Sequence, residues 1–180
     1  ILKIFVTPGA PAANPEEFIP CYLSYDEICT VVEEAKAMNI RTAAHCIGGK
    51  GLDYCVRAGI DVIEHVYSIT PEQVKLLEEE FGGWIDMTSG IVLDPEREPY
   101  CPPASVKKVR AAREYSRQCM NRIYQSGKIR YTIGTDANHG QLYKELEYAC
   151  EGGASALDAL KGVTVHAAGM CGAGNRTGQI

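Results

Sequence analysis

Short apolar segments rich in β-branched residues alternate along this chain with longer segments of helical periodicity. No other feature of the sequence constrains the fold as strongly. Five segments have the character of buried strands: Ile1–Val6, Ile40–His45, Ile60–His65, Trp84–Met87 and Lys128–Thr135. A strand followed by a helix, five times in succession, predicts a parallel sheet with right-handed crossovers and helices outside it.

Local signals mark the ends of several helices. Ser24-Tyr25-Asp26-Glu27 matches a capping box and predicts a helix to about Asn39. Thr70-Pro71-Glu72-Gln73 combines an N-cap with an early proline and predicts a helix that ends at Gly82-Gly83. A helix from Gly48 is expected to close at Gly59. The remaining predicted segments are a loop over Thr7–Pro20, a long irregular stretch over Thr88–Pro103, and helices over Val106–Gly127, Gln141–Glu151 and Ser155–Met170.

Two α/β architectures contain such a series of units: a complete five-stranded doubly wound domain, or five of the eight units of a (β/α)8 TIM barrel. A barrel unit averages about 31 residues, so five units and a tail fill most of 180 residues. Ile1–Val6 resembles the middle of a strand, and an extended segment is expected to start near Gly178. We therefore expect the chain to be a piece of a longer polypeptide.

Charge and composition exclude several classes of partner. Lysine and arginine number 18 against 23 acidic residues, and the net charge of −5 disfavours binding to nucleic acid or anionic lipid. No apolar run reaches the roughly 18 residues of a membrane span, and the first residues do not resemble a signal peptide. The eight cysteines form no C-x-x-C pair and are expected to be reduced thiols. These features predict a soluble, cytoplasmic protein.

Polar residues suited to metal binding stand at or near the carboxyl ends of four predicted strands. They are Lys3, His45, the Glu64-His65 pair and Asp136, which follows Thr135. In a barrel these ends converge on one face, whereas in an open sheet the outermost lie far apart. Imidazoles and carboxylates bind Zn²⁺ and similar cations, and such sites activate water. The pattern therefore favours the barrel and a metal-dependent hydrolysis.

Each of these residues also has a structural interpretation. A single histidine is more often a hydrogen-bonded core residue than a ligand, Lys3 can extend to the sheet edge, and Asp136 can cap a turn. Together these interpretations are weaker, because charged groups at the ends of several buried strands cost several kcal/mol each when unpaired.

An ordered set of motifs resembles the amidohydrolase superfamily, and within it the imidazolonepropionase-like and Xaa-Pro dipeptidase (prolidase) branch. The motifs are Ile1–Val6, Ala43-Ala44-His45, Ala58–His65, Ile133–Ala137, Ala159-Leu160 to Thr164, Ala167–Gly172 and Thr177–Ile180. The resemblance implies a (β/α)8 barrel with a small β-sandwich. Residues 1–172 would supply about strands 4 to 8, and residues 173–180 would enter the β-sandwich.

The resemblance also implies roles for individual residues. Lys3 would be carbamylated and bridge two metal ions, and His45 and His65 would be metal ligands. Asp136 would bind metal and carry a proton from the attacking water to the leaving nitrogen. The implied cofactor is a divalent metal, zinc, as one or two ions. Two departures stand out: the family's His-x-His pair has no counterpart among histidines 45, 65, 139 and 166, and Val66 replaces a common glycine.

Substrate contacts are assigned to two residues. Tyr67 lies two positions after His65, so in a strand it points to the same side and is placed to polarise a carbonyl. It can equally pack beneath the next helix. His139 lies beyond Asp136 and is a candidate for holding a substrate carboxylate. Arg97, in the long loop, is a candidate for gating the site, and Cys46 adjoins His45.

The sequence therefore predicts a metal-dependent hydrolase that cleaves an amide or peptide-type C–N bond of a small substrate, such as an Xaa-Pro dipeptide or a cyclic amide. Two alternatives stay open. One is a catalytically silent fragment with a structural or association role, and the other is an aldolase-like barrel in which Lys3 forms a Schiff base. Five barrel units leave two unpaired sheet edges, so we expect a fragment to associate, and the full-length protein to be a homo-oligomer.

Overall fold

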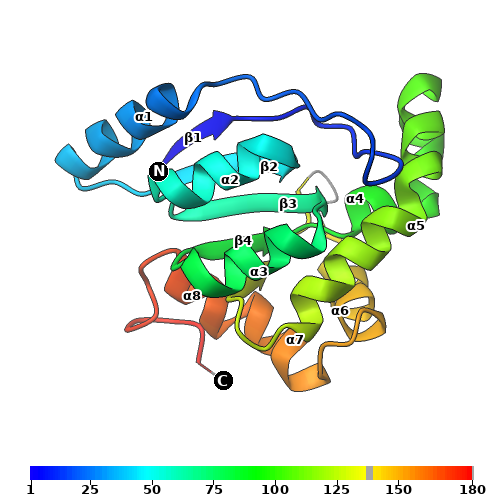
Figure 1. Ribbon diagram of the computed structural model, residues 1–180. Helices are drawn as coiled ribbons and strands as arrows, with labels where there is room; N and C mark the ends of the chain where they lie inside the picture. The colour runs from blue at the N-terminus through cyan, green and yellow to red at the C-terminus, as the bar shows by residue number, and fades with distance from the viewer. Residues whose placement is uncertain (137–139, 180) are drawn as a thin grey trace.

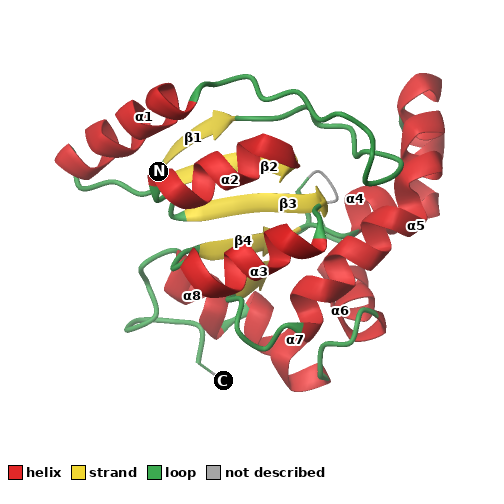
Figure 2. Cartoon of the chain, in the orientation of Figure 1, coloured by secondary structure: helices red, strands yellow, loops and turns green. Residues whose placement is uncertain are grey.

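In the computed structural model, which describes residues 1–136 and 140–179, five strands form one sheet. Every neighbouring pair of strands is parallel, and the strand order follows the sequence, β1-β2-β3-β4-β5. Helices surround this sheet, as Figure 2 shows. The strands are β1 (Leu2–Phe5), β2 (Thr42–Gly48), β3 (Val62–Ser68), β4 (Trp84–Met87) and β5 (Tyr131–Ile133).

The sequential strand order decides between the two predicted architectures. A doubly wound sheet reverses its order at a switch point, whereas a barrel adds each strand beside the previous one. The observed order is that of a barrel, and the prediction of a parallel α/β barrel segment is confirmed. Figure 1 shows α2 against the sheet, and α2 contacts β2, β3 and the helices on either side of it.

The helices α1 and α3 begin where the capping signals predict and end two residues before the predicted ends at Asn39 and Gly82. The Ser24 side chain accepts the backbone N–H of Glu27, which completes the capping box of α1, and Thr70 and Gln73 form the same motif at α3. Gly59 ends α2 with a φ of 81°, a conformation that glycine adopts without strain. The longer helices are α1 (Tyr25–Ala37), α2 (Gly49–Ala58), α3 (Pro71–Glu80), α5 (Pro103–Gln125), α6 (Leu142–Glu151), α7 (Ala156–Val163) and α8 (Val165–Met170).

Several segments differ from the prediction, and the strand expected over Lys128–Thr135 is limited to β5, Tyr131–Ile133. The expected helix Ser155–Met170 is broken at Thr164, whose φ and ψ of −123° and −94° are not helical. The break allows α7 to pack on β5 through Gly162, while the ring of His166 in α8 lies near Trp84. The stretch Thr88–Pro103 is not irregular throughout, because it contains the short helix α4 (Gly90–Leu93) and a 3₁₀ helix, η1 (Pro95–Tyr100).

Strands β2 and β3 extend three residues beyond their predicted ends at His45 and His65. The pairing between them shifts register between Cys46 and Gly48, and His65 and Val66 adopt positive φ angles of 85° and 48°. This irregularity interrupts the normal alternation of side chains in β3. As a result, His65 lies beside Glu64, its neighbour in sequence, rather than on the opposite face.

The chain beyond α8 adds little to the sheet. Residues 173–179 form turns held by hydrogen bonds from Arg176 and Thr177 to the Ala173 carbonyl. Their assignment to a second domain stays a prediction. Among residues 1–136 and 140–179, no helix has the length and apolar character needed to cross a bilayer.

Candidate metal centre

Five residues occupy the same register position on the five strands. Phe5 pairs with His45, His45 with Glu64, Glu64 with Asp86, and Asp86 with Thr132. Because alternate residues of a strand face opposite sides, these side chains lie on the face of the sheet away from the apolar core. We call Phe5, His45, Glu64, Asp86 and Thr132 the polar row.

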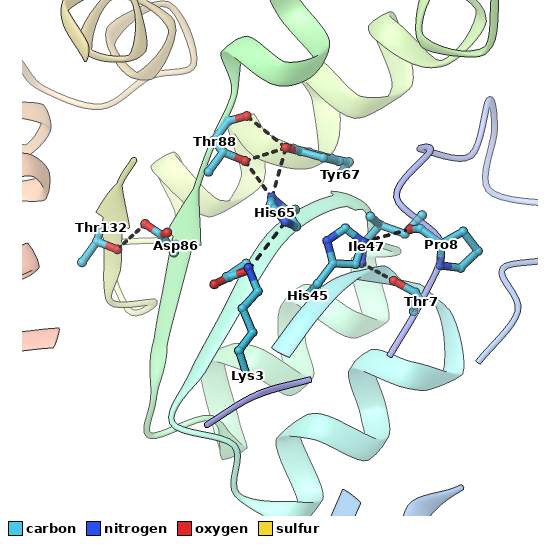
Figure 3. A network of polar contacts seen from close by, with 11 residues as sticks. Lys3, Thr7, Pro8, His45, Ile47, His65, Tyr67, Asp86, Thr88 and Thr132 are labelled. Atoms are coloured by element: carbon cyan, nitrogen blue, oxygen red, sulfur yellow. Dashed lines mark hydrogen bonds and ion pairs between the residues drawn. The ribbon is translucent and has the colours of Figure 1, made fainter. Parts of the chain in front are cut away.

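His45 is fixed from two sides. Its ring stacks on Phe5, with centroids 4.9 Å apart, and its Nε2 lies 3.1 Å from the carbonyl oxygen of Pro8. A carbonyl oxygen only accepts hydrogen bonds, so this contact assigns the proton to Nε2. The lone pair of Nδ1 is therefore free to bind a cation. The Thr7 hydroxyl accepts the N–H of Ile47 and fastens the same loop to β2, as Figure 3 shows.

His65 lies beside His45, with ring centroids 4.5 Å apart. Its Nδ1 is 2.8 Å from the Thr88 hydroxyl and 3.2 Å from the Tyr67 hydroxyl, whereas its Nε2 faces Glu64 (Figure 3). Burial lowers the pKa of His65 to about 3, and the charges of His45 and Lys3 contribute to this decrease. The imidazole is therefore neutral at physiological pH, which is the form that binds metals.

Lys3 reaches the polar row from outside it. The residue is the second of β1 rather than the last, and its Nζ lies 2.6 Å from Glu64 Oε2. With 42% of its side chain exposed, the amine is accessible from solvent. A carbamate on this amine would place an anion beside the Glu64 carboxylate, so carbamylation requires a cation between the two groups.

Asp136 follows β5, is exposed, and has a φ of 49°. Burial raises the pKa of Asp86 to about 6, the charges of Glu64 and Asp136 add to the rise, and a hydrogen bond from Thr132 at 2.7 Å opposes it. Asp136 therefore acts electrostatically on the polar row. His139 lies outside the described residues.

The donor chemistry of this cluster fits a divalent cation. Two adjacent imidazoles, each oriented through one ring nitrogen by an oxygen of a neighbouring loop, resemble ligands supported by outer hydrogen bonds. The complete predicted set of Lys3, His45, His65 and Asp136 is not assembled. Within residues 1–136 and 140–179, no three His, Cys, Asp or Glu side chains lie together in metal-binding positions.

Tyr67 and Cys46 lie close to the histidines but differ in orientation. Tyr67 is on the same side as His65, with 1% of its surface exposed, and its hydroxyl donates to the Thr88 carbonyl at 3.0 Å. Cys46 is buried, and its thiol points toward Cys55 of α2, away from the polar row. The structure contains all eight cysteines as free thiols.

Three groups that support the candidate site were not predicted from the sequence. The Pro8 carbonyl and the Thr88 hydroxyl orient the two histidines from loops, and no local pattern reveals such contacts. Asp86 had a detectable signal, because it is the one charged residue in an otherwise apolar predicted strand, Trp84–Met87. Glu64 was identified as a polar strand-end residue suited to metal binding, but its ion pair with Lys3 was not predicted.

The Amidohydrolase family model matches residues 8–180, and the chain therefore belongs to the amidohydrolase family. Among solved structures, a Xaa-Pro dipeptidase with methionine bound in its active site aligns with a TM-score of 0.81 at 26% identity, over 98% of this chain and 45% of that one. A prolidase complexed with N-methylphosphonate-L-proline aligns with a TM-score of 0.78 at 25% identity, over 99% of this chain and 45% of that one.

An ochratoxinase from A. niger aligns with a TM-score of 0.76 at 26% identity, over 98% of this chain and 41% of that one. The chain thus spans less than half the length of these three structures. No curated protein sequence matches it. The comparisons agree with the barrel-like strand order and with the class of hydrolase expected from the strand-end residues.

Proposed function

We propose that the protein containing this chain is a metal-dependent hydrolase that cleaves an amide or peptide-type C–N bond of a small substrate. The candidate substrates are a dipeptide such as Xaa-Pro and a cyclic amide. The observation that supports this function most strongly is the pair of adjacent imidazoles, His45 and His65, each oriented by a loop oxygen. Similarity to a Xaa-Pro dipeptidase and a prolidase supports the same reaction class.

In this proposal, His45, His65, carbamylated Lys3 and Asp136 hold one or two divalent ions, with zinc as the expected metal. The metal supplies Lewis acidity that activates water toward a carbonyl carbon. The loop oxygens hold the two imidazoles in place, since each contacts one ring nitrogen and leaves the other to face the site. Glu64 lies next to both Lys3 and His65 and adds negative charge to the site.

Asp136 is assigned to proton transfer. Its carboxylate accepts the proton of the attacking water and delivers it to the leaving nitrogen, so that the amine departs neutral. Its exposed position after β5 keeps it accessible to substrate. Tyr67 and His139 are assigned to substrate binding. Because the Tyr67 hydroxyl donates to the Thr88 carbonyl, it must turn from this partner to polarise a substrate carbonyl.

The aldolase-like alternative would use Lys3 as a Schiff-base nucleophile. Both this chemistry and a carbamate require the Lys3 amine to leave its 2.6 Å ion pair with Glu64, so that contact does not separate the two hypotheses. The silent-fragment alternative is motivated by the lack of a His-x-His pair in the sequence. These two alternatives and the hydrolase differ in metal content and in turnover.

The test measures metal content and hydrolysis of Xaa-Pro dipeptides with the full-length protein. We expect stoichiometric divalent metal and turnover in the wild type, and loss of both in the double variant His65→Ala, Asp136→Asn. His166→Ala is the matched control, because His166 lies in α8 and contacts the Tyr131 carbonyl, and it should keep metal and activity. Turnover that persists in the double variant, or a wild type without metal, would contradict the proposal.

A further inference from the structure

We propose that a cavity beside His45 binds the end of the substrate that carries an apolar side chain and a free carboxylate, with Arg97 as the partner of that carboxylate. The inference rests on the proposed hydrolase function and narrows its substrate class. We call this cavity the Arg97 pocket. Six of its lining residues come from three segments of the chain: Gly9, Ala10, Ile91, Arg97, Val106 and Val109.

The pocket lies beside His45, and its walls continue from the two segments that contact the histidines of the candidate metal centre. A Cβ atom at Gly9 would lie 3.9 Å from His45 Cε1, and the preceding residue, Pro8, contacts the His45 ring. On the other side, Thr88, which contacts His65, precedes Ile91 of the pocket wall by three residues. Each of these walls therefore continues directly from a segment that orients one histidine. A ligand that fills the pocket past Gly9 would therefore reach the His45 side of the centre.

The two acids that line the pocket, Asp94 and Glu98, already have cationic partners. Asp94 lines the pocket and pairs with Lys144 at 2.9 Å. Glu98 also lines it and pairs with Arg110 and with Arg113, at 2.7 Å from the latter. Hydrogen bonds from these two arginines lower the pKa of Glu98 to about 2, so its carboxylate is ionised and engaged.

Arg97 differs from the other arginines of this region. Its Nη1 donates to the carbonyl oxygen of Ile91, which fixes the side chain against α4. It forms no ion pair with any residue in the described part of the chain. The two acids of the wall have their own partners, and the charge of Arg97 acts on the buried Glu145 carboxylate without forming an ion pair with it. Its remaining donors suit a planar carboxylate.

The rest of the wall selects for an apolar group. Ile91, Val106 and Val109 supply aliphatic surface, and the cavity has a volume of about 360 Å³. This volume is near the lower end for small-molecule sites, about 300 to 1,000 Å³, and suits a ligand of one or two amino-acid residues. An aliphatic wall with a single unpaired guanidinium favours a dipeptide or an N-acyl amino acid with a free carboxylate over a neutral cyclic amide.

The test measures binding of two matched probes to the full-length protein by isothermal titration calorimetry. N-acetyl-L-leucine carries the carboxylate, and N-acetyl-L-leucinamide replaces it with a neutral amide. We expect the acid to bind more tightly than the amide, and we expect Arg97→Gln to lower the affinity for the acid by about tenfold or more. Amide binding should change less than about twofold, because it makes no charged contact.

Three further variants separate recognition from folding. Arg97→Lys keeps the charge and should restore part of the preference for the acid. Arg117→Gln is the matched control, since Arg117 pairs with Glu151 on the outside of α5. This variant should bind both probes as tightly as the wild type does. Val106→Trp fills the pocket and should weaken both probes. Circular dichroism on each variant verifies that the fold is retained.

The outcomes distinguish this inference from the proposed function. Two results would overturn the assignment of Arg97 as the carboxylate partner, even if dipeptides are hydrolysed. They are equal binding of the acid and the amide by the wild type, and an unchanged affinity for the acid in Arg97→Gln. Conversely, a carboxylate preference that depends on Arg97 supports the pocket even if no hydrolysis is detected. With active enzyme, Arg97→Gln should raise KM for the dipeptide more than it lowers kcat.

Discussion

Two neighbouring rows of the same sheet differ sharply in chemistry. The polar row carries His45, Glu64, Asp86 and Thr132, whereas the row one position earlier consists of Ile4, Ala44, Ile63, Ile85 and Tyr131. We call the latter the apolar row. Its members belong to or pack against the core beneath the helices, and Ile63 is 0% exposed, in contrast to 61% for Phe5 of the polar row.

The difference shows how one set of strands serves two purposes. Successive residues of a strand point to opposite faces, so a shift of a single residue separates the side chains that stabilise the fold from those available for chemistry. The apolar row gains free energy through burial. The polar row places ionisable groups close together, which costs free energy unless partners or a cation compensate. The following predictions test this division.

The largest expected effect follows from a cavity in the apolar row. Ile63→Ala should reduce the free energy of unfolding by about 2–5 kcal/mol, because the side chain is fully buried and its neighbours cannot fill the space. Urea unfolding measures the change. The matched control is Phe5→Ala in the polar row. Because this ring is exposed, its removal should lower the free energy of unfolding by less than about 1 kcal/mol. Equal losses in the two variants would break the distinction between the rows.

The second prediction concerns Glu145, a carboxylate buried in α6 outside the polar row. Burial raises its pKa to about 7, although the backbone N–H of Gly90 donates to it at 2.8 Å. Because the folded protein favours the protonated form, its contribution to stability is full below about pH 4.5 and declines as the pH rises toward 7. The decline should amount to at most about 3 kcal/mol.

Glu145→Gln should remove this decline, since glutamine accepts the same hydrogen bond without a charge. Urea unfolding between pH 4 and 8 measures the two profiles. Glu147→Gln on the same helix is a control that should leave the profile unchanged. A wild-type stability that rises across this range, and an identical rise in Glu145→Gln, would contradict the assignment.

The third prediction addresses support for the polar row. Thr88→Val retains the shape of the side chain but removes the hydroxyl that lies 2.8 Å from His65 Nδ1. Loss of such an outer hydrogen bond typically lowers metal affinity by about 10–100-fold. Competition with a chromophoric chelator measures the affinity for zinc. Thr30→Val, on the exposed side of α1, should have no effect, and an unaltered affinity in Thr88→Val would remove Thr88 from the site.

The smallest effect is expected at the ion pair that joins Lys3 to the polar row. A double-mutant cycle with Lys3→Met and Glu64→Gln in metal-free protein should give a coupling energy of about 0.2–1 kcal/mol, because the Lys3 side chain is partly exposed. Unfolding free energies of the four proteins measure it. A coupling of zero would show that the contact adds nothing to stability.

Much of the fold could be predicted because its signals are local. The caps at Ser24, Thr70 and Gly59 and the order of the strands follow from short sequence patterns and from the handedness of strand-helix units. The break at Thr164 could not be predicted, since it depends on where α7 and α8 pack against the sheet.

The candidate site was predictable in its residue types but not in its geometry. The positive φ angles at His65 and Val66 bring His65 beside Glu64, and β-branched Val66 gives no hint of that conformation. The reach of Lys3 to Glu64 and the contacts of Pro8 and Thr88 with the histidines depend on loops and long side chains. Such contacts appear only when distant segments are placed together.

The central claim is that His45 and His65 bind the same divalent cation. X-ray absorption spectroscopy of the zinc-loaded full-length protein tests it most directly, because the spectrum distinguishes nitrogen and oxygen ligands from sulfur and reveals imidazole by its outer scattering. We predict two or more imidazoles for each zinc ion, and a lower imidazole contribution after His45→Ala or His65→Ala. A zinc ion bound by thiolate sulfur, or a spectrum unchanged by both substitutions, would contradict the account.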